Sequence, residues 1–113
     1  MADSIYLGYD IKLDRSWGFM EDPIRKKLLY RATHRGIKEA DIILGAYATA
    51  KLPGMSDSDL GEFEQLLELN DKELYPWIIG EKGIPPEWAD GLIRDIQQFT
   101  KDHAAEIQKR IQP

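Results

Sequence analysis

Apolar side chains recur at helical spacing from residue 22 onward. Asp22 is a favourable N-cap, and Pro23 suits the first helical position, where its missing N–H has no intrahelical partner. Gly36 is suited to end this helix in the left-handed conformation, because it lacks a Cβ. The pattern therefore predicts a first helix whose buried stripe consists of Ile24, Leu28 and Ala32.

Two further helices are predicted on either side of Pro53 and Gly54, which end the earlier one. The earlier helix spans about residues 38–52, and its apolar face comprises Ile42, Ile43, Ala46, Tyr47 and Ala50. The later helix starts at Ser56, and Asp59 three residues on completes a variant of the capping box. Its apolar face comprises Leu60, Phe63, Leu66 and Leu67.

A short fourth helix is capped by Asn70 or Asp71, kept brief or distorted by Pro76, and closed by Gly80. The segment GEKGIPPEW that follows is a loop by its glycines and prolines. Two tryptophans bracket this loop, and we expect them to pin it to the core: Trp77 and Trp88.

The last helix is predicted to start at about residue 87. Its apolar positions are Trp88, Leu92, Ile93, Ile96 and Phe99. The same period continues at His103, Ile107 and Ile111, but with fewer apolar residues. We therefore expect the end of this helix to extend past the core.

Together these elements predict an all-α protein, a small single-domain bundle of about five helices over residues 22–113. Residues 1–21 show no clean period, and we expect a partly ordered N-terminal extension there. The composition is that of an ordinary globular domain, 42% apolar and 31% charged over 113 residues.

Composition and charge exclude several classes of site. There is no cysteine, so disulfides, a cysteine zinc site and a thiol nucleophile are excluded. No apolar run approaches the ~20 residues that span a bilayer, so we expect no membrane insertion. The net charge of −5 combines −1 over residues 1–20, +3 over residues 21–52 and −7 over residues 53–113. Because nucleic acid requires a broad basic face, this balance favours a protein partner.

Catalytic and metal-binding motifs do not occur. His34 and His103 lack the spacing of metal ligands, and we expect His103 at the surface. His34 lies near Glu39 in sequence, but no nucleophile or oxyanion hole accompanies them. Five acids follow a solvated helix face and not a cation site: Asp57, Asp59, Glu62, Glu64 and Glu68. We therefore predict no catalytic residues, no metal site and no enzyme activity.

The turn RATHRGIKEAD, residues 31–41, concentrates charge around one glycine. Arg35 directly precedes Gly36, and Glu39 follows three positions later. Helix macrodipoles favour a cation and an anion at these helix ends, by ~0.3–1 kcal/mol each. A corner with opposite charges and exposed backbone also suits docking of another protein, where arginine is a favoured anchor. The residues alone leave both interpretations open, and we expect both side chains to emerge at one corner.

Several motifs occur in a familiar order and spacing. They are RG-x-x-E at residues 35–39, the following Asp41, the run LLELNDKELYPWIIG and the G-x-P turn at residues 83–85. Over about residues 22–98 the chain therefore resembles the succinate dehydrogenase assembly factor family. It departs from the commonest pattern at three positions, with His34 in place of arginine, Ile37 in place of methionine and Ala40 in place of leucine.

The resemblance implies a five-helix protein that is not itself an enzyme. Members bind the flavoprotein subunit of succinate dehydrogenase, or of fumarate reductase, and promote covalent attachment of FAD to a histidine of that subunit. No cofactor would be stably bound by this chain, because FAD would be attached to the partner. Carried over by position, the partner-binding residues would be Arg35, Gly36 and Glu39, with His34 and Asp41 beside them.

The resemblance, with no targeting segment recognised at the N-terminus, leads us to expect a location in the bacterial cytoplasm. Two other classes stay open. One is a helical adaptor with an unrelated partner. The other is a helix-turn-helix nucleic-acid binder that would use a basic first helix and turn: Arg25, Lys26, Lys27, Arg31 and Arg35.

Overall fold

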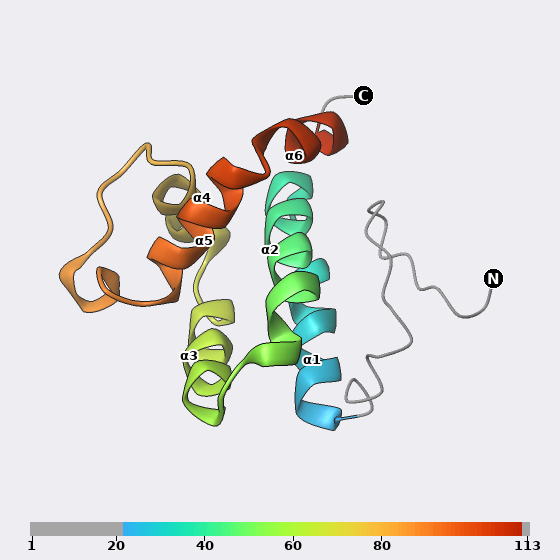
Figure 1. Ribbon diagram of the computed structural model, residues 1–113. Coiled ribbons are helices and arrows are strands. Elements are labelled where there is room, and N and C mark those ends of the chain that lie inside the picture. The colour runs from blue at the N-terminus through green and yellow to red at the C-terminus, as the bar shows by residue number, and fades with distance from the viewer. Residues whose placement is uncertain (1–21, 112–113) are drawn as a thin grey trace.

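The computed structural model describes residues 22–111, which form an all-α fold (Figure 1). Its helices are α1 (Pro23–Thr33), α2 (Lys38–Lys51), α3 (Asp57–Leu67), α4 (Asp71–Ile78), α5 (Leu92–Asp102) and α6 (Ala104–Ile111). Two short 3-10 turns lie in the connections, η2 (Leu52–Gly54) and η3 (Pro86–Trp88). The all-α prediction is confirmed, with six helices in place of about five. The extension predicted for residues 1–21 lies outside the described part of the chain.

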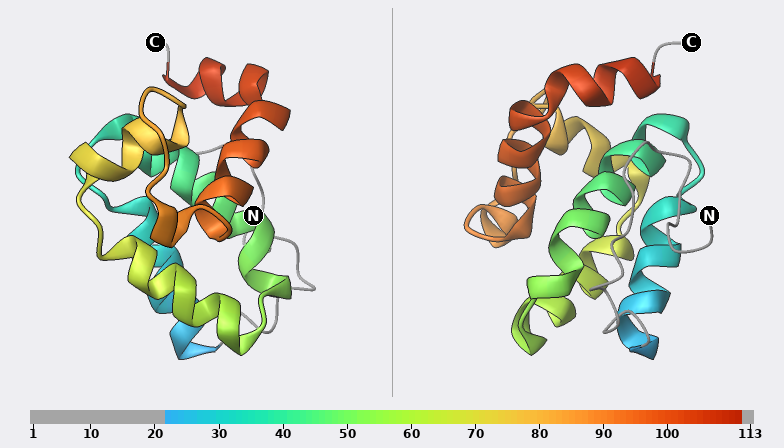
Figure 2. Two further views of the ribbon diagram at one scale, coloured as in Figure 1. Left: turned by 90° about the vertical axis from the view of Figure 1, so that its left-hand side faces the viewer. Right: turned by 45° about the vertical axis from the view of Figure 1, so that its right-hand side comes forward.

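The central helix of the bundle is α2. Residues 42–49 are all buried, because α1, α5 and α6 pack around this helix. Figures 1 and 2 show α6 lying across the end at which α2 begins, and α1 also packs against α3. Ala50, predicted on the buried face, is instead exposed, because it lies in the last turn beside an open pocket that Lys51 and Met55 also line.

The first helix begins as predicted. The Asp22 carboxylate accepts a hydrogen bond from the Ile24 N–H at 3.0 Å, and Pro23 occupies the first helical position. Ile24 itself was predicted on the buried stripe and is 56% exposed. The side chain that faces the bundle in this turn is Arg25, whose guanidinium donates to the carbonyls of Leu52 and Met55 at 2.9 and 2.7 Å. Its neighbour Ile24, about 100° around the helix, therefore points to solvent.

The third and fourth helices also follow the prediction. Ser56 caps α3 by accepting from the Asp59 N–H at 3.1 Å, and Asn70 caps α4 by accepting from the Lys72 N–H at 2.8 Å. Pro76 lies inside α4, which is only eight residues long. The four apolar residues predicted for the face of α3 are all buried: Leu60, Phe63, Leu66 and Leu67. Trp77 and Trp88 are half-buried against the core, as predicted for the ends of the loop.

The last predicted helix starts later than expected. Trp88 lies in η3, and α5 begins at Leu92. Gly91 has an extended backbone with φ −114° and ψ −152°, which interrupts the helical path. A carboxylate from α3 then caps the new helix, because Glu62 accepts a hydrogen bond from the Leu92 N–H at 2.9 Å. This capping group is 30 residues away in sequence, so local pattern does not reveal it.

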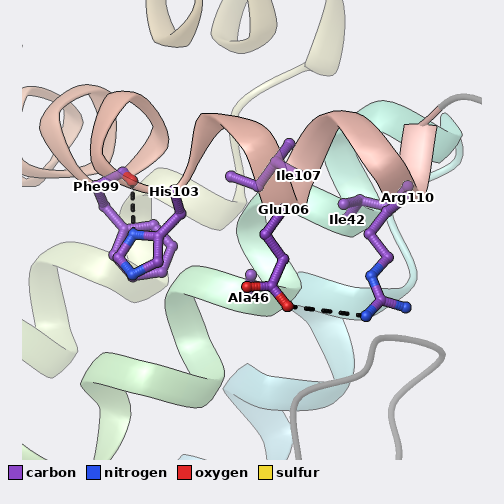
Figure 3. A pocket seen from close by; sticks show the side chains of 7 residues that line it. All are labelled: Ile42, Ala46, Phe99, His103, Glu106, Ile107 and Arg110. Carbon is purple, nitrogen blue, oxygen red and sulfur yellow. Dashed lines mark hydrogen bonds and ion pairs between the residues drawn. The ribbon is translucent and has the colours of Figure 1, made fainter.

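The same predicted helix is also broken at His103 (Figure 3). The imidazole stacks on the Phe99 ring with centroids 4.2 Å apart, and its Nδ1 lies 2.9 Å from the Phe99 carbonyl oxygen. The chain then turns, and α6 folds back so that Ile107 is buried against α2. The expectation that this end extends past the core is therefore wrong at Ile107, whereas His103 is exposed, as predicted.

Candidate docking surface at the α1–α2 turn

The first helix ends before Gly36. The Thr33 hydroxyl lies 3.0 Å from the Leu29 carbonyl oxygen, and His34 Nδ1 lies 2.8 Å from the Tyr30 carbonyl oxygen. Side chains therefore satisfy carbonyls of the last turn, and the helix ends at Thr33. Gly36 does have a positive φ of +121°, but it shapes the turn and does not cap the helix. The predicted helix end was wrong, and the predicted conformation of the glycine was right.

The side chain of Arg35 points into the protein. It is 8% exposed, and its guanidinium donates to the Asp71 carboxylate at 3.0 Å. It also donates to the carbonyl oxygens of Leu67 and Leu69, at 2.6 and 2.7 Å. These acceptors lie at the end of α3 (Leu67), in the α3–α4 connection (Leu69) and at the start of α4 (Asp71), so Arg35 ties the α1–α2 turn to that connection. The expectation that this side chain emerges at a corner is wrong.

The two acids of the turn have different surroundings. Asp41 accepts a hydrogen bond from the Arg35 backbone N–H and so fixes the turn from the α2 side. Glu39 is half-buried and lies near Tyr75 of α4. Burial, and next the negative charge of Glu39, raise the pKa of the Tyr75 phenol. Within residues 22–111 no ion pair joins Glu39 to Arg35, so the two charges of the motif serve different parts of the structure.

A surface groove of about 550 Å³ lies beside the turn. The last turn of α1 and residues 34–37 form one wall, and residues 67–72 form the other. Of the five predicted site residues, the structure brings His34, Arg35 and Gly36 to this groove. Glu39 and Asp41 do not line it.

The groove also contains an aromatic pair that sequence reasoning missed. Tyr30 and His34 stack with ring centroids 3.9 Å apart and an interplanar angle of 13°. Tyr30 is 63% exposed, and Ile37 on the same wall is 39% exposed. The spacing of Tyr30 and His34 was the available signal, because residues four apart on a helix are neighbours.

Four of the five cations proposed for nucleic-acid binding interact with groups of the protein itself, and the fifth, Lys26, is exposed. Arg25 and Arg35 donate to backbone carbonyls, as described above. Arg31 pairs with Glu68 at 2.6 Å, and this hydrogen-bonded pair lowers the pKa of the Glu68 carboxyl. Lys27 lies 3.5 Å from Glu64. These pairs leave no continuous basic face on α1, which disfavours the helix-turn-helix alternative.

Other features of the described residues offer no competing site. The pocket in Figure 3, between α2 and the α5–α6 junction, encloses about 30 Å³, room for one or two waters. No group of three or more histidine, cysteine, aspartate or glutamate side chains in residues 22–111 is placed to hold a metal ion. None of the helices described is long and apolar enough to cross a membrane.

A family model described as a flavinator of succinate dehydrogenase matches residues 26–100. The match covers more than half of the chain and includes the α1–α2 turn and both walls of the groove. The chain belongs to this family. Its membership confirms the resemblance drawn from the RG-x-x-E motif and the downstream positions.

Relatives of the chain include both bacterial and mitochondrial proteins. The FAD assembly factor SdhE of Acetobacter pasteurianus is 36% identical over 87 residues, which are 74% of this chain and 80% of the relative. The mitochondrial succinate dehydrogenase assembly factor 2 of Dictyostelium discoideum is 31% identical over 81 residues, which are 72% and 57% of the two chains. That of Saccharomyces cerevisiae strain YJM789 is 31% identical over 90 residues, or 76% and 56%. The match thus spans little more than half of these mitochondrial relatives.

Proposed function

We propose that this protein is an assembly factor that binds the flavoprotein subunit of succinate dehydrogenase and promotes covalent attachment of FAD to that subunit. The observation that carries the proposal is the family match over residues 26–100, which includes the turn and its groove. The names of the bacterial and mitochondrial relatives support it. The protein assists assembly and is not itself an enzyme.

Such a factor acts by positioning the reacting groups of its partner. The flavin-accepting histidine and the flavin both belong to the partner, so the factor acts by holding the partner in a conformation that brings them together. Holding reactants near attack geometry is worth several kcal/mol of a barrier, up to roughly 7–11 kcal/mol in favourable cases. This mechanism requires a rigid docking surface and no reactive group on the factor. We propose accordingly that this chain binds no FAD stably.

The turn is the proposed contact region. Gly36 is exposed and presents bare backbone, and His34 is exposed beside it. Glu39 lies half-buried on the first turn of α2, next to this backbone. Arg35 and Asp41 support the turn from within. A location in the bacterial cytoplasm, where a flavoprotein subunit is made, belongs to the same proposal and is supported by the bacterial relative.

The direct test is in-gel flavin fluorescence of the flavoprotein subunit from cells lacking this chain. We expect the covalent flavin signal to fall strongly and to return when the gene is restored. A covalent flavin signal as strong as that of wild-type cells would refute the proposal. Restoration with Glu39→Ala should be incomplete, whereas restoration with Glu87→Ala, an exposed acid in η3, should match the wild type. Helical circular dichroism of both variants should stay unchanged.

Co-purification separates the assembly factor from an adaptor with an unrelated partner. A tagged full-length chain should recover the flavoprotein subunit of succinate dehydrogenase or of fumarate reductase as its dominant partner. Recovery of a different dominant protein, with the flavoprotein absent, would favour the adaptor.

A further inference from the structure

We propose that the groove beside the α1–α2 turn receives an acidic segment of the flavoprotein that carries an apolar side chain, and that Arg35 builds this groove without touching the partner. The inference rests on the proposed function and specifies the surface and the chemistry of docking. It assigns direct contact to residues other than the arginine and the glutamate of the RG-x-x-E motif, chiefly Tyr30, Ile37 and Lys72.

The groove contains a concentration of exposed apolar surface. Only four large apolar side chains are exposed in residues 22–111, and two of them, Tyr30 and Ile37, line this groove. The other two, Ile24 and Ile79, lie outside it, and isolated exposed apolar residues are ordinary. Tyr30 is held by its stack with His34, whose Nδ1 also lies near the Tyr30 carbonyl oxygen. An aromatic group already ordered before binding loses little entropy on docking, which suits it as an anchor.

The charge of the groove is opposite to that of the whole chain. Its lining contains three cations, Arg31, Arg35 and Lys72, and one carboxylate, Asp71, whereas the chain has a net charge of −5. Arg35 and Asp71 pair with each other inside the wall, and Arg31 shares its charge with Glu68. Lys72 is exposed and forms no ion pair with another described residue. The rim is therefore positive at Lys72, which favours approach of an acidic segment.

The backbone at Gly36 adds hydrogen-bonding capacity. Neither its N–H nor its C=O has a hydrogen bond to another residue of the described range. A Cβ built on Gly36 would meet nothing within 4 Å, so the space above this backbone is open. A partner segment can approach here closely, as an exposed glycine permits.

Arg35 determines the distance between the two walls. Its backbone N–H donates to Asp41, which holds the wall formed by the α1–α2 turn. Its guanidinium donates to Leu67, Leu69 and Asp71 in the opposite wall. With 8% of the side chain exposed, little of it is left for a partner. Its influence on binding is therefore indirect, through the shape of the groove, and we regard it as a positioning residue.

The test measures the Kd of the full-length chain for the purified flavoprotein subunit of succinate dehydrogenase. Tyr30→Ala and Lys72→Glu should each weaken binding by about 10-fold or more, the effect of losing ~1.4 kcal/mol. Matched controls outside the groove are Ile24→Ala, another exposed apolar residue of α1, and Lys101→Glu, another exposed lysine. Both controls should bind within about 2-fold of the wild type, and urea midpoints should show that all four variants fold.

The outcomes distinguish the two proposals. Absence of any binding by the wild-type chain would overturn the proposed function. Binding by the wild type, with both groove variants equal to their controls, would overturn the inference and leave the function standing.

A double variant tests the indirect role of Arg35. Arg35→Lys keeps the charge but not the three-way hydrogen bonding, and it should weaken binding about 10-fold in the wild-type background. In the Tyr30→Ala background, where the anchor is already gone, it should weaken binding by less than about 2-fold. Independent, multiplying effects would mean that Arg35 does not act by positioning Tyr30, and would refute this indirect role.

Discussion

Replacing Arg35 by alanine is expected to destabilise the fold, not only the binding of a partner. The guanidinium makes hydrogen bonds to Asp71, Leu67 and Leu69, with 8% of the arginine side chain and 13% of the aspartate side chain exposed. Removing one member of a buried ion pair costs about 3–5 kcal/mol, because the other charge stays behind without its partner. The carbonyl oxygens of Leu67 and Leu69, at the end of α3 and in the α3–α4 connection, also lose a donor.

The expected loss of ~3–5 kcal/mol is large compared with the total free energy of unfolding. A domain of about 90 residues has an unfolding free energy of roughly 5–14 kcal/mol at ~0.05–0.15 kcal/mol per residue. Urea unfolding followed by circular dichroism at 222 nm should therefore show a midpoint lower by about 2–5 M, for a loss of ~3–5 kcal/mol and a slope of ~1–1.5 kcal/mol/M. Asp71→Asn should lower the urea midpoint less in the Arg35→Ala variant than in the wild type, because the two side chains interact.

Arg31→Ala is the matched control. Arg31 also forms an arginine–carboxylate pair, but its partner Glu68 is 66% exposed. Such a surface pair contributes about 0–1 kcal/mol, so this variant should stay within ~1 kcal/mol of the wild type. If Arg35→Ala unfolds at the same urea concentration as Arg31→Ala, the reasoning that makes Arg35 an internal clamp is refuted.

Two further predictions concern the core of α2. Thr49 is buried, and its hydroxyl has no hydrogen-bond partner among residues 22–111, so Thr49→Val should raise the unfolding free energy by about 1 kcal/mol. Thr100→Val, which removes a hydroxyl bonded to the Ile96 carbonyl at 2.7 Å, should give no such gain in urea unfolding, and an equal gain would contradict the argument. Burial, and next its hydrogen bond to Asp95, raise the pKa of Tyr47 above the ordinary value of about 10. Because the folded state favours the protonated phenol, its contribution to stability is complete below pH ~10 and falls above it, by up to ~1.4 kcal/mol per pH unit. Urea midpoints at pH 8, 10 and 11 should show a shallower decline for Tyr47→Phe than for the wild type, and parallel declines would show that this tyrosine is not responsible.

Local signals predicted well where local groups determine the structure. Asp22 and Pro23 start α1, Ser56 starts α3, and the period of apolar residues marks the buried face of α3. These features depend on residues within a few positions of one another, so they are visible in the sequence. The positive φ of Gly36 was predictable for the same reason.

The predictions failed where a distant side chain takes part. The start of α5 depends on Glu62, 30 residues earlier, and Ile107 is buried only because α6 folds back on α2. Ile24 belongs to the apolar period of α1, yet Arg25 takes the inward position because carbonyls of Leu52 and Met55 lie there to receive it. The period of apolar residues does not show which groups of other elements pack against a helix.

By itself, the sequence determined an all-α domain, most of its helix starts and, through the RG-x-x-E motif and the positions that follow it, the family. Only the tertiary structure decided how the charges of that motif are used. Arg35 turns inward because its acceptors, 32–36 residues away in sequence, gather at the α3–α4 connection. The stacked Tyr30 and His34, with Gly36, are thereby left at the surface beside the groove. A charge in a sequence does not say whether it meets solvent, a partner or the chain's own backbone, because that depends on which remote groups folding brings to it.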